Sequence, residues 1–239
     1  IVRSQLNISA PEISSPEDYI RIFDRNGFFE PTSISKDDIS RNEMYKANAE
    51  RTRFAARFES YRDYLLSLNM TAEIEPFSAV YLPRITQLTN KSNQFNLTTK
   101  RYTQNEIEEI SRNRGYIHLY GRLEDKFGDN GVVSVIIGKI EGGDLHIDLW
   151  LMSCRVLKRD MEYAMLDSLV EKCREKNIKN IYGYYYKTKK NSMVSGLYKQ
   201  FGLLNYMKMK KGDSKWLLDI SVYKNKNNVI LVKEREETK

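Results

Sequence analysis

One stretch of the sequence, residues 144–203, constrains the fold more than any other because strand and helix patterns alternate within it. Asp144–Met152 alternates apolar and polar side chains, which predicts a half-buried strand. The polar turn Ser153–Arg159 leads into a helix with an apolar side chain at every fourth position. A β-rich run at Asn180–Tyr186 and a helix at Asn191–Phe201 follow. A strand that enters a helix through a short turn aims free main-chain N–H groups at whatever ligand lies above the turn.

The second helix carries the spacing Asn-x-x-Val-x-x-x-Tyr-x-x-x-Gly, at Asn191, Val194, Tyr198 and Gly202. This pattern resembles the last conserved segment of the GNAT acyltransferase superfamily, in which a Tyr one turn before a Gly faces the thioester sulfur. The resemblance implies that Tyr198 protonates a departing thiolate, and a packing aromatic is the alternative. Asn191 would either cap its helix or bond a pantetheine arm.

The remaining patterns fit the same superfamily. A long helix is expected from about Lys36 to Leu68, because large apolar residues recur every three to five positions. A strand, two helices and three antiparallel strands follow, with hairpin turns at Asp129–Gly131 and Glu141–Asp144, and a closing hairpin comes after Leu203. The order β-α-α-β-β-β-α-β-α-β-β predicts an α/β (α+β) mixed sheet with helices on both faces. In the GNAT fold two central parallel strands splay apart, and the gap admits a pantetheine arm.

Three stretches resemble a narrower family: Leu82–Tyr102, Leu151–Arg159 and Lys187–Val194. They are similar to the C-terminal region of FkbH-like proteins, in which a HAD-superfamily phosphatase-like domain of subfamily IIIC precedes a GNAT-like domain. The resemblance covers about residues 18–223. FkbH-like proteins are associated with loading a three-carbon glyceryl unit from a glycolytic acyl phosphate onto an acyl carrier protein. That chemistry is assigned mainly to the HAD part, and the GNAT-like part would receive or present the phosphopantetheine arm.

The resemblance also implies a division of the chain. The HAD signature Asp-x-Asp-x-Thr is absent from the sequence, so we expect a fragment of a longer protein whose HAD-like domain is a partner. The expected parts are residues 1–35, the tail of the HAD-like domain and a linker; 36–69, a long connecting helix; 70–224, the GNAT-like domain; and 225–239, a polar tail.

The turn before the central helix departs from the GNAT pattern. CoA-dependent members have Gln/Arg-x-x-Gly-x-Gly/Ala here, so that main-chain N–H groups approach a pyrophosphate. Asp160 and Glu162 fall at those glycines, and Lys158 and Asp160 replace the glycines of the FkbH-like version. Two carboxylates would repel a pyrophosphate, which argues against tight binding of free CoA. Arg155, Lys158 and Arg159 would meet the single phosphodiester of a carrier-bound arm or an acidic carrier surface; a solvated basic turn is the alternative.

Other candidates lie near the expected gap. Cys154, with Met152 and Ser153, is at the end of the central strand, where a pantetheine arm passes in GNAT proteins. Its thiol would hold an acyl group in transit or only fill space. The amides of Gln94 and Asn96 would bond a pantetheine amide or a polar acyl unit, or else the end of the preceding helix.

The titratable residues add little. His118 and His146 are the only histidines, and each is a candidate base or a satisfied strand residue. Asp148 alternates with His146, so a His–carboxylate pair is one option. No metal-ligand spacing is present, so no metal is expected. The two cysteines lack zinc-site spacing and indicate a reducing cytoplasm.

Composition limits the partners. The 239 residues carry 39 basic and 32 acidic side chains, a net charge of +7, which favours an acidic partner such as a nucleotide-bearing cofactor, a carrier protein or nucleic acid. Basic residues are spread along the chain and no nucleic-acid-binding motif is present, so nucleic acid ranks low. No apolar run approaches the ~18 residues of a membrane span, so no membrane partner is expected.

These observations leave three hypotheses. The leading one is a GNAT-fold transferase acting on an acyl group carried on acyl-carrier-protein phosphopantetheine, with Tyr198 as the acid. The first alternative is a non-catalytic module that docks the carrier for the HAD-like domain. The second is an ordinary N-acetyltransferase that uses acetyl-CoA. The cofactor would be a phosphopantetheine thioester or CoA.

Overall fold

The computed structural model describes residues 13, 15–25 and 41–233. The chain forms two compact units, residues 1–46 and 47–239. In the first unit, a 3-10 turn leads into helix α2 (Tyr19–Arg25). Most of the predicted HAD-like tail and linker, and the predicted start of the long helix, lie outside the described residues.

The region predicted as one long helix forms two helices, α4 (Arg41–Ala55) and α5 (Tyr61–Ser67), so the prediction of a continuous helix was wrong. Ser60 caps α5, because its hydroxyl accepts a 3.3 Å hydrogen bond from a main-chain N–H in the first turn of that helix. The rings of Phe54 and Phe58 pack edge to face across the break, with centroids 4.9 Å apart. The cap and the aromatic contact together stabilise the turn between the two helices.

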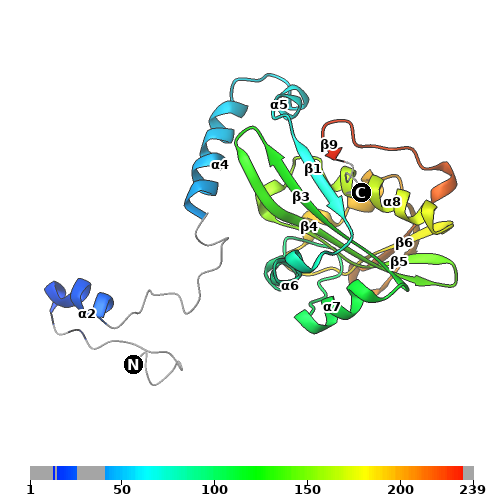
Figure 1. Cartoon of the computed structure of the whole chain (residues 1–239), viewed down its shortest axis with the longest axis horizontal. Helices are drawn as coiled ribbons and strands as arrows, with labels where there is room; N and C mark the ends of the chain where they lie inside the picture. Colours follow the sequence, from blue (N-terminus) through cyan, green and yellow to red (C-terminus); the bar gives the residue numbers. More distant parts are fainter. Residues whose placement is uncertain (1–12, 14, 26–40, 234–239) are drawn as a thin grey trace, which may run out of the picture. The chain divides into compact units, whose positions relative to one another are not determined.

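In the described part of the second unit, nine strands form one mixed sheet in the order β7-β8-β6-β5-β4-β3-β1-β9, with β2 paired to β5 outside this path (Figure 1). The strands are β1 (Thr71–Glu75), β2 (Phe95–Asn96), β3 (Tyr116–Asp125), β4 (Gly128–Glu141), β5 (Asp144–Met152), β6 (Asn180–Tyr185), β7 (Leu204–Lys208), β8 (Ser214–Asp219) and β9 (Leu231–Lys233). β3, β4 and β5 form an antiparallel meander, whereas β5 and β6 run parallel. The predicted order of elements is confirmed, and β2 and β9 are additions to it.

Helices cover both faces of this sheet (Figure 1). α6 (Leu82–Lys91) and α7 (Gln104–Arg112) bury their apolar side chains against one face. α8 (Met161–Glu175) buries a stripe of Met, Leu and Val side chains against the other face. None of the helices in the described ranges is both long enough and apolar enough to pass through a lipid bilayer.

The predicted helix Asn191–Phe201 is shorter in the structure. It consists of the 3-10 turn Ser192–Val194 and one helical turn, α9 (Leu197–Gln200). Gly202 ends α9 with φ of 79°, the left-handed conformation that glycine adopts most readily after a helix.

The hairpin between β3 and β4 turns at Lys126 and Phe127, because Asp125 pairs with Gly128. The prediction of this turn at Asp129–Gly131 was therefore wrong. The second predicted hairpin turn, between β4 and β5, is confirmed.

The predicted polar tail, residues 225–239, is ordered in its first part. β9 pairs in parallel with β1 at the edge of the sheet. Before it, the carboxylate of Asp167 in α8 accepts hydrogen bonds from the main-chain N–H groups of Lys226, at 3.0 Å, and Asn227, at 2.8 Å. Residues 234–239 lie outside the described part of the chain.

Candidate functional site

The parallel strands β5 and β6 pair over only two residues, at their N-terminal ends, and then diverge. The cause is an extra residue in β5. Leu149 lies opposite Ile137 of β4, and Ile147 lies opposite the next residue, Gly138. Asp148 therefore forms a bulge, which bends the strand that carries it. The predicted pair of splayed parallel strands is confirmed.

A segment of the chain itself fills the space between the diverging strands; we call residues 95–98 the gap segment. Its β2 residues pair with the end of β5, and the N–H of Leu97 donates to the carbonyl oxygen of Trp150 at 3.0 Å. On the other side, the N–H of Tyr186 donates to the carbonyl oxygen of Leu97 at 2.9 Å. All four residues are at most 4% exposed. In this structure the gap does not admit a pantetheine arm, contrary to expectation, because the gap segment lies between the strands and is hydrogen-bonded on both sides.

Asn191 is fully buried and fastens the gap segment to the loop after β6. Its amide nitrogen donates to the carbonyl oxygens of Asn96 and Tyr186, both at 2.9 Å. Its amide oxygen accepts the main-chain N–H of Thr188 at 2.8 Å. The side chain makes no capping bond to the following helix. The predicted helix cap was therefore wrong: the amide of Asn191 holds two loops together in this structure. Its role as a pantetheine contact stays a prediction.

Asn96 belongs to the helix-end network that was the alternative to a substrate contact. Its amide nitrogen donates to the carbonyl oxygen of Ser92 at 3.3 Å, and its amide oxygen accepts the N–H of Thr99 at 2.8 Å. Both ends of the amide thus bond to the turn after α6 in this structure, and the role of Asn96 as a substrate contact stays a prediction. The neighbouring Gln94 is exposed, and its role as a pantetheine contact stays a prediction.

The turn between β5 and α8 keeps the backbone of a glycine-rich loop. Lys158 has φ of 64° and Asp160 has φ of 61°, a left-handed conformation that favours glycine. The hydroxyl of Tyr61 in α5 donates to the carbonyl oxygen of Lys158 and holds the turn in place. The two positions assigned to lost glycines from sequence are therefore the two strained positions of the turn.

The residues at the start of this turn differ in exposure. Met152 and Ser153 are buried, whereas Cys154 is exposed, so the packing role that was the alternative for Cys154 was wrong. The hydroxyl of Ser153 accepts the N–H of Arg155 at 3.4 Å. Arg155 is half-buried and Lys158 is exposed. Their roles as contacts for a phosphodiester, and that of Cys154 as an acyl carrier, stay predictions.

Arg159 lies in a buried ionic cluster. Its guanidinium donates to Asp125 at 3.0 Å and to Asn130 at 3.3 Å. Arg51 of α4 binds the same carboxylate through two hydrogen bonds of 2.8 Å. Burial, followed by repulsion from Arg51, lowers the pKa of Arg159. The guanidinium of Arg159 thus binds α4 and the β3–β4 hairpin to the turn, and its role as a phosphodiester contact stays a prediction.

Two carboxyl groups occupy the N-terminal end of α8, where a GNAT pyrophosphate would lie. Asp160 is the N-cap residue and Glu162 is in the first turn. Burial raises the pKa of Asp160, and burial raises that of Glu162 to about 7. One oxygen of Glu162 is buried and has no hydrogen-bond partner among the described residues. The exclusion of a pyrophosphate from this turn stays a prediction, and Glu162 emerges as a titratable group that the sequence did not reveal.

Tyr198 of α9 lies against the two diverging strands. Its ring contacts Trp150 of β5, with centroids 6.5 Å apart, and passes directly over Gly183 of β6, where a Cβ atom would lie 2.5 Å from the ring. The Tyr198 hydroxyl and the Trp150 indole N–H are both buried and have no hydrogen-bond partner among the described residues. Burial raises the pKa of Tyr198 strongly. The nearby main-chain N–H of Tyr184 lowers this pKa by a smaller amount, although it does not meet the geometry of a hydrogen bond. The phenol therefore stays protonated at neutral pH.

Three features of the second unit decide the fold: the strand order, the divergence of β5 and β6, and the left-handed turn into α8. The chain has a GNAT-like fold. No protein-family model and no curated protein matches the sequence. The FkbH-like family and the HAD-like neighbour stay predictions.

Solved structures, acetyltransferases among them, are similar to this chain. The ribosomal-protein-S18-alanine N-acetyltransferase of Escherichia coli is 11% identical, with 66% of this chain and 99% of that chain covered and a TM-score of 0.47. Ard1 from Thermoplasma volcanium is 17% identical, with 62% of this chain and 97% of that chain covered and a TM-score of 0.47. Spermidine N-acetyltransferase from Vibrio cholerae, in complex with CoA and spermine, is 10% identical, with 63% of this chain and 96% of that chain covered and a TM-score of 0.49.

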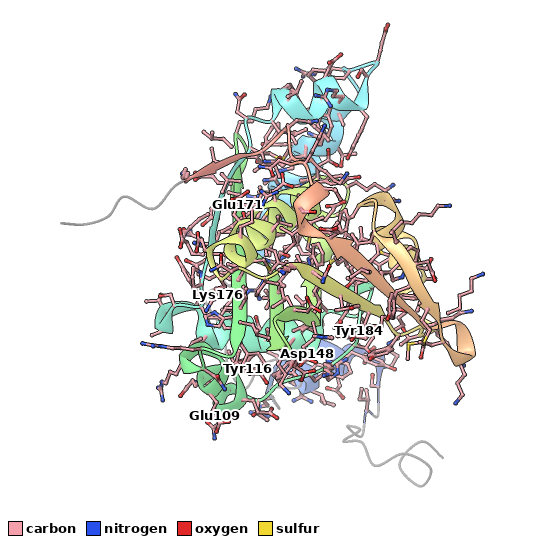
Figure 2. All side chains as sticks on the ribbon, turned by 90° about the vertical axis from the view of Figure 1, so that its right-hand side faces the viewer. Glu109, Tyr116, Asp148, Glu171, Lys176 and Tyr184 are labelled. Carbon is pink, nitrogen blue, oxygen red and sulfur yellow. The ribbon has the colours of Figure 1, made fainter. Side chains whose placement is uncertain are left out.

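On the face of the sheet opposite Tyr198, β5 and β6 present polar side chains, among them Asp148 and Tyr184 (Figure 2). The carboxylate of Asp148 accepts hydrogen bonds from Lys100 and from the hydroxyl of Tyr102. The Nδ1 of His146 lies 2.7 Å from the hydroxyl of Tyr184. Since each has another partner, the His146–Asp148 pair is not formed. Burial lowers the pKa of His146, which keeps this imidazole neutral at pH 7.

His118 is the second histidine and serves the fold. Its Nδ1 accepts the main-chain N–H of Phe77 at 3.0 Å, and the two rings lie 4.6 Å apart. Burial lowers its pKa, in agreement with the alternative of a satisfied strand residue. In the part of the chain that the structure describes, His, Cys, Asp and Glu side chains do not gather in threes that could hold a metal ion.

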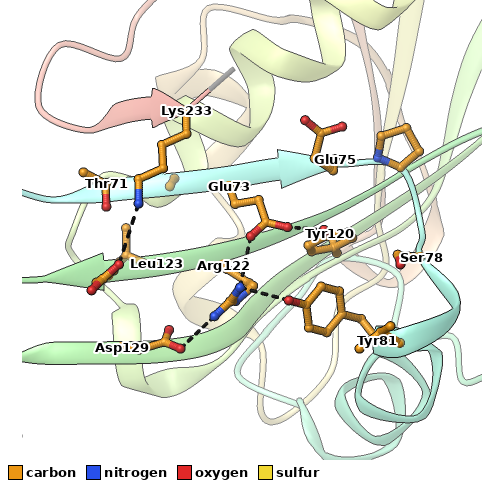
Figure 3. Close-up of a pocket in the computed structure, with 14 residues that line it drawn as sticks. Thr71, Glu73, Glu75, Ser78, Tyr81, Tyr120, Arg122, Leu123, Asp129 and Lys233 are labelled. Atoms are coloured by element: carbon orange, nitrogen blue, oxygen red, sulfur yellow. Dashed lines mark hydrogen bonds and ion pairs between the residues drawn. The ribbon is translucent and has the colours of Figure 1, made fainter. Parts of the chain in front are cut away.

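A pocket of about 460 Å³ lies on β1 and β3, away from the diverging strands (Figure 3). Arg122 crosses it and donates to Glu73 at 3.0 Å, to the hydroxyl of Tyr81 at 2.9 Å and to Asp129 at 2.8 Å. Sequence analysis missed this pocket because its side chains come from separate strands and loops. Arg122 already pairs with Glu73 and Asp129, and Glu124 pairs with Lys233, so we assign no ligand to this pocket.

Proposed function

We propose that this chain is an acyltransferase-like domain that acts on an acyl thioester carried on the phosphopantetheine arm of an acyl carrier protein. The observation that carries the proposal is the buried hydroxyl of Tyr198, which has no partner among the described residues. Leaving a buried hydroxyl unpaired costs about 1–3 kcal/mol. A ligand atom that accepts its proton would remove this cost, and the indole N–H of Trp150 offers a second donor beside it.

The chemistry follows from the protonation state of Tyr198. An amine or hydroxyl acceptor attacks the thioester carbonyl carbon, its bond to that carbon forms, and the carbon–sulfur bond breaks. Tyr198 gives its proton to the departing sulfur and regains one through solvent from the acceptor. Because burial raises the pKa of Tyr198, the phenol holds a proton to give at neutral pH.

The turn before α8 favours a carrier-bound arm over free CoA. Asp160 and Glu162 stand where the pyrophosphate of CoA would lie, and Arg159 is turned into the ionic cluster. A carrier-bound arm has one phosphodiester, which exposed Lys158 and half-buried Arg155 would meet. The resemblance to FkbH-like proteins adds the carrier, a glyceryl unit as its acyl group and a HAD-like domain as the partner that loads it.

For the arm to reach Tyr198, the gap segment has to leave its place between β5 and β6. This requirement favours a second candidate function, a non-catalytic module that docks the carrier for the HAD-like domain. In that case the gap segment would stay in place, with Leu97 bonded to Trp150 of β5 and to Tyr186, the residue after β6.

The test uses this chain with a carrier in three forms: apo, phosphopantetheinylated and glyceryl-loaded. Intact mass spectrometry would follow loss of the glyceryl thioester with a small primary amine as acceptor. We expect Tyr198→Phe to slow this loss by about 10²–10⁴-fold, as removal of a general acid does. Tyr45→Phe, an exposed tyrosine of α4, is the matched control and should have no effect.

Each outcome decides between the candidates. Full activity of Tyr198→Phe would contradict its role as proton donor. Carrier binding by calorimetry without thioester loss would favour the docking module. Micromolar binding of acetyl-CoA by the same method would show that the turn accepts a pyrophosphate and that the choice of a carrier is wrong.

A further inference from the structure

The excess positive charge of the chain lies in one segment. Residues 187–215 contain eight lysines and a single acidic residue, Asp213, which gives a net charge of +7. The whole chain has the same net charge, +7, so the remainder is neutral overall. Basic residues occur along the entire sequence, but outside this segment acidic residues balance their charge. We call residues 187–215 the lysine segment.

Most of these lysines face solvent. The exposed ones are Lys187, Lys189, Lys190, Lys199, Lys208 and Lys211. Within the described ranges, none of them takes part in an ion pair; the ion pairs there involve other residues. Their charge is therefore available to a partner.

Large apolar side chains are exposed among these lysines. They are Met193 (52%), Leu204 (72%), Tyr206 (53%), Met207 (53%) and Met209 (39%). β7, which carries three of them, is the last strand of the sheet, so its outer main-chain groups have no neighbouring strand in the described sheet. Lysines alone on such a strand would be explained as protection against edge-to-edge aggregation. That explanation does not account for the apolar side chains, which are typical of an interaction surface.

The lysine segment adjoins the end of the gap between β5 and β6. Lys187 follows Tyr186, whose N–H bonds the gap segment. The N–H of Lys187 donates to Asp213 at 2.7 Å, and a Cβ atom on Gly212 would lie 2.9 Å from the Lys187 side chain. The loop after β6 and the turn between β7 and β8 are thus one continuous surface, at the end of the strands where an arm would enter.

We propose that the lysine segment is the docking surface for an acidic protein, the carrier whose arm the domain receives; this rests on the proposed function. Positive potential at the gap attracts an acidic partner and orients it, while the apolar side chains supply contact area. A nucleic acid would pair with the lysines and leave Leu204 and Met207 without an apolar partner. A lipid bilayer would leave the outer main-chain groups of β7 unbonded, whereas a protein segment can pair with them.

Charge reversal tests the surface separately from the chemistry. The variant Lys187→Glu with Lys190→Glu would be compared with Lys176→Glu with Lys179→Glu, which changes the charge equally at the opposite end of β6. Binding of the apo carrier, which has no arm, would be measured by calorimetry at low and moderate salt. We expect the first variant to weaken binding at least tenfold at low salt and the control to change it less than twofold. Salt should weaken wild-type binding.

The apolar contribution needs its own variant, Leu204→Ser with Met207→Ser. We expect it to weaken apo-carrier binding about as strongly at moderate salt as at low salt, because apolar contacts are not screened. Circular dichroism would confirm that each variant is folded; both positions are exposed, so folding should persist.

The outcomes separate this inference from the proposed function. If the apo carrier binds the charge-reversed variant as tightly as the wild type, the docking surface is wrong, and thioester loss still decides the function. If reversal abolishes docking but the wild type never consumes the thioester, the surface stands and the acyl transfer falls. Reversal-sensitive binding of single-stranded RNA or of anionic phosphatidylserine vesicles, with no binding of the carrier, would overturn the choice of an acidic protein.

Discussion

The amide of Asn191 donates a 2.9 Å hydrogen bond to the carbonyl oxygen of Asn96, and by this bond the loop after β6 holds the gap segment in place. Asn191→Ala would leave one buried and one part-buried carbonyl oxygen, and one N–H, without their partner. We expect a loss of about 2–3 kcal/mol in the free energy of unfolding, measured by urea denaturation, and faster hydrogen exchange at Leu97. Asn205→Ala, on exposed β7, is the control. Unchanged exchange at Leu97 would show that the Asn191 amide is not needed to hold the gap segment.

Gly183 makes room for the ring of Tyr198. A Cβ atom at this position would lie 2.5 Å from that ring, which Trp150 and Trp216 hold on its other sides. We expect Gly183→Ala to reduce the free energy of unfolding by about 1–3 kcal/mol and to change tryptophan fluorescence. Gly196→Ala is the control, because nothing lies within 4 Å of a Cβ atom there. Equal stability of the two variants would mean that the Tyr198 ring can move freely.

The ionic cluster at the turn predicts a large effect at Asp125. Its carboxylate binds both Arg51 and Arg159, which are 5% and 7% exposed. Asp125→Asn would leave two buried guanidinium groups without a counter-charge, and we expect a loss of about 3–5 kcal/mol in thermal and urea unfolding. The partly exposed Asp129, paired with Arg122, is the control: Asp129→Asn should cost less than about 1 kcal/mol. Similar losses of stability in Asp125→Asn and Asp129→Asn would contradict the burial of the ionic cluster around Asp125.

Glu162 should make stability depend on pH. Burial raises its pKa from 4.5 to about 7 in the folded state, so ionisation is easier in the unfolded chain. Its contribution to stability is therefore present below about pH 4.5 and is lost as the pH rises to about 7. Relative to Glu162→Gln, we expect wild-type stability to fall by about 1–3 kcal/mol between pH 5 and 8. The control Glu109→Gln, at an exposed position, should show the same dependence of stability on pH as the wild type. If the stability of the wild type and of Glu162→Gln changed in parallel with pH, the raised pKa of Glu162 would be refuted.

Local patterns predicted the elements of the fold but not the continuity of the first long helix. The apolar spacing between Lys36 and Leu68 is helical on both sides of the break, so periodicity alone does not show it. The missed signal was the cap: Ser60 followed three residues later by Asp63 marks a helix start inside the run.

The strand β5 shows a subtler limit. Leu145, Ile147, Leu149 and Leu151 alternate in sequence and predicted one buried face. In the structure Leu145 and Ile147 face α8, whereas Leu149 and Leu151 face α6 and α7. The bulge between the two pairs reverses the alternation, so the second half of β5 is buried on both faces. An inserted residue of this kind leaves no mark in the hydrophobic pattern.

Within the candidate site, sequence reasoning placed what depends on local chain geometry. The left-handed positions of the turn and the helical turn of Tyr198 follow from short-range spacing. The gap segment could not be predicted, because its partners Trp150, Tyr186 and Asn191 lie far away in sequence. Asn96 and Asn191 were assigned to substrate for the same reason: a buried amide needs polar partners, and the sequence does not show that main-chain carbonyls supply them.

The bulge at Asp148 also bears on how such a site can arise or be lost. Removing this one residue would leave Ile147 and Leu149 on their present faces, because they already alternate across it. Deletion of one codon would thus straighten β5 without turning any apolar side chain of that strand into water. If the strands then closed together, the gap segment, with the buried Phe95 and Leu97, would have to leave its place. An insertion or deletion, rather than a substitution, is the change that would create or abolish the opening of the sheet.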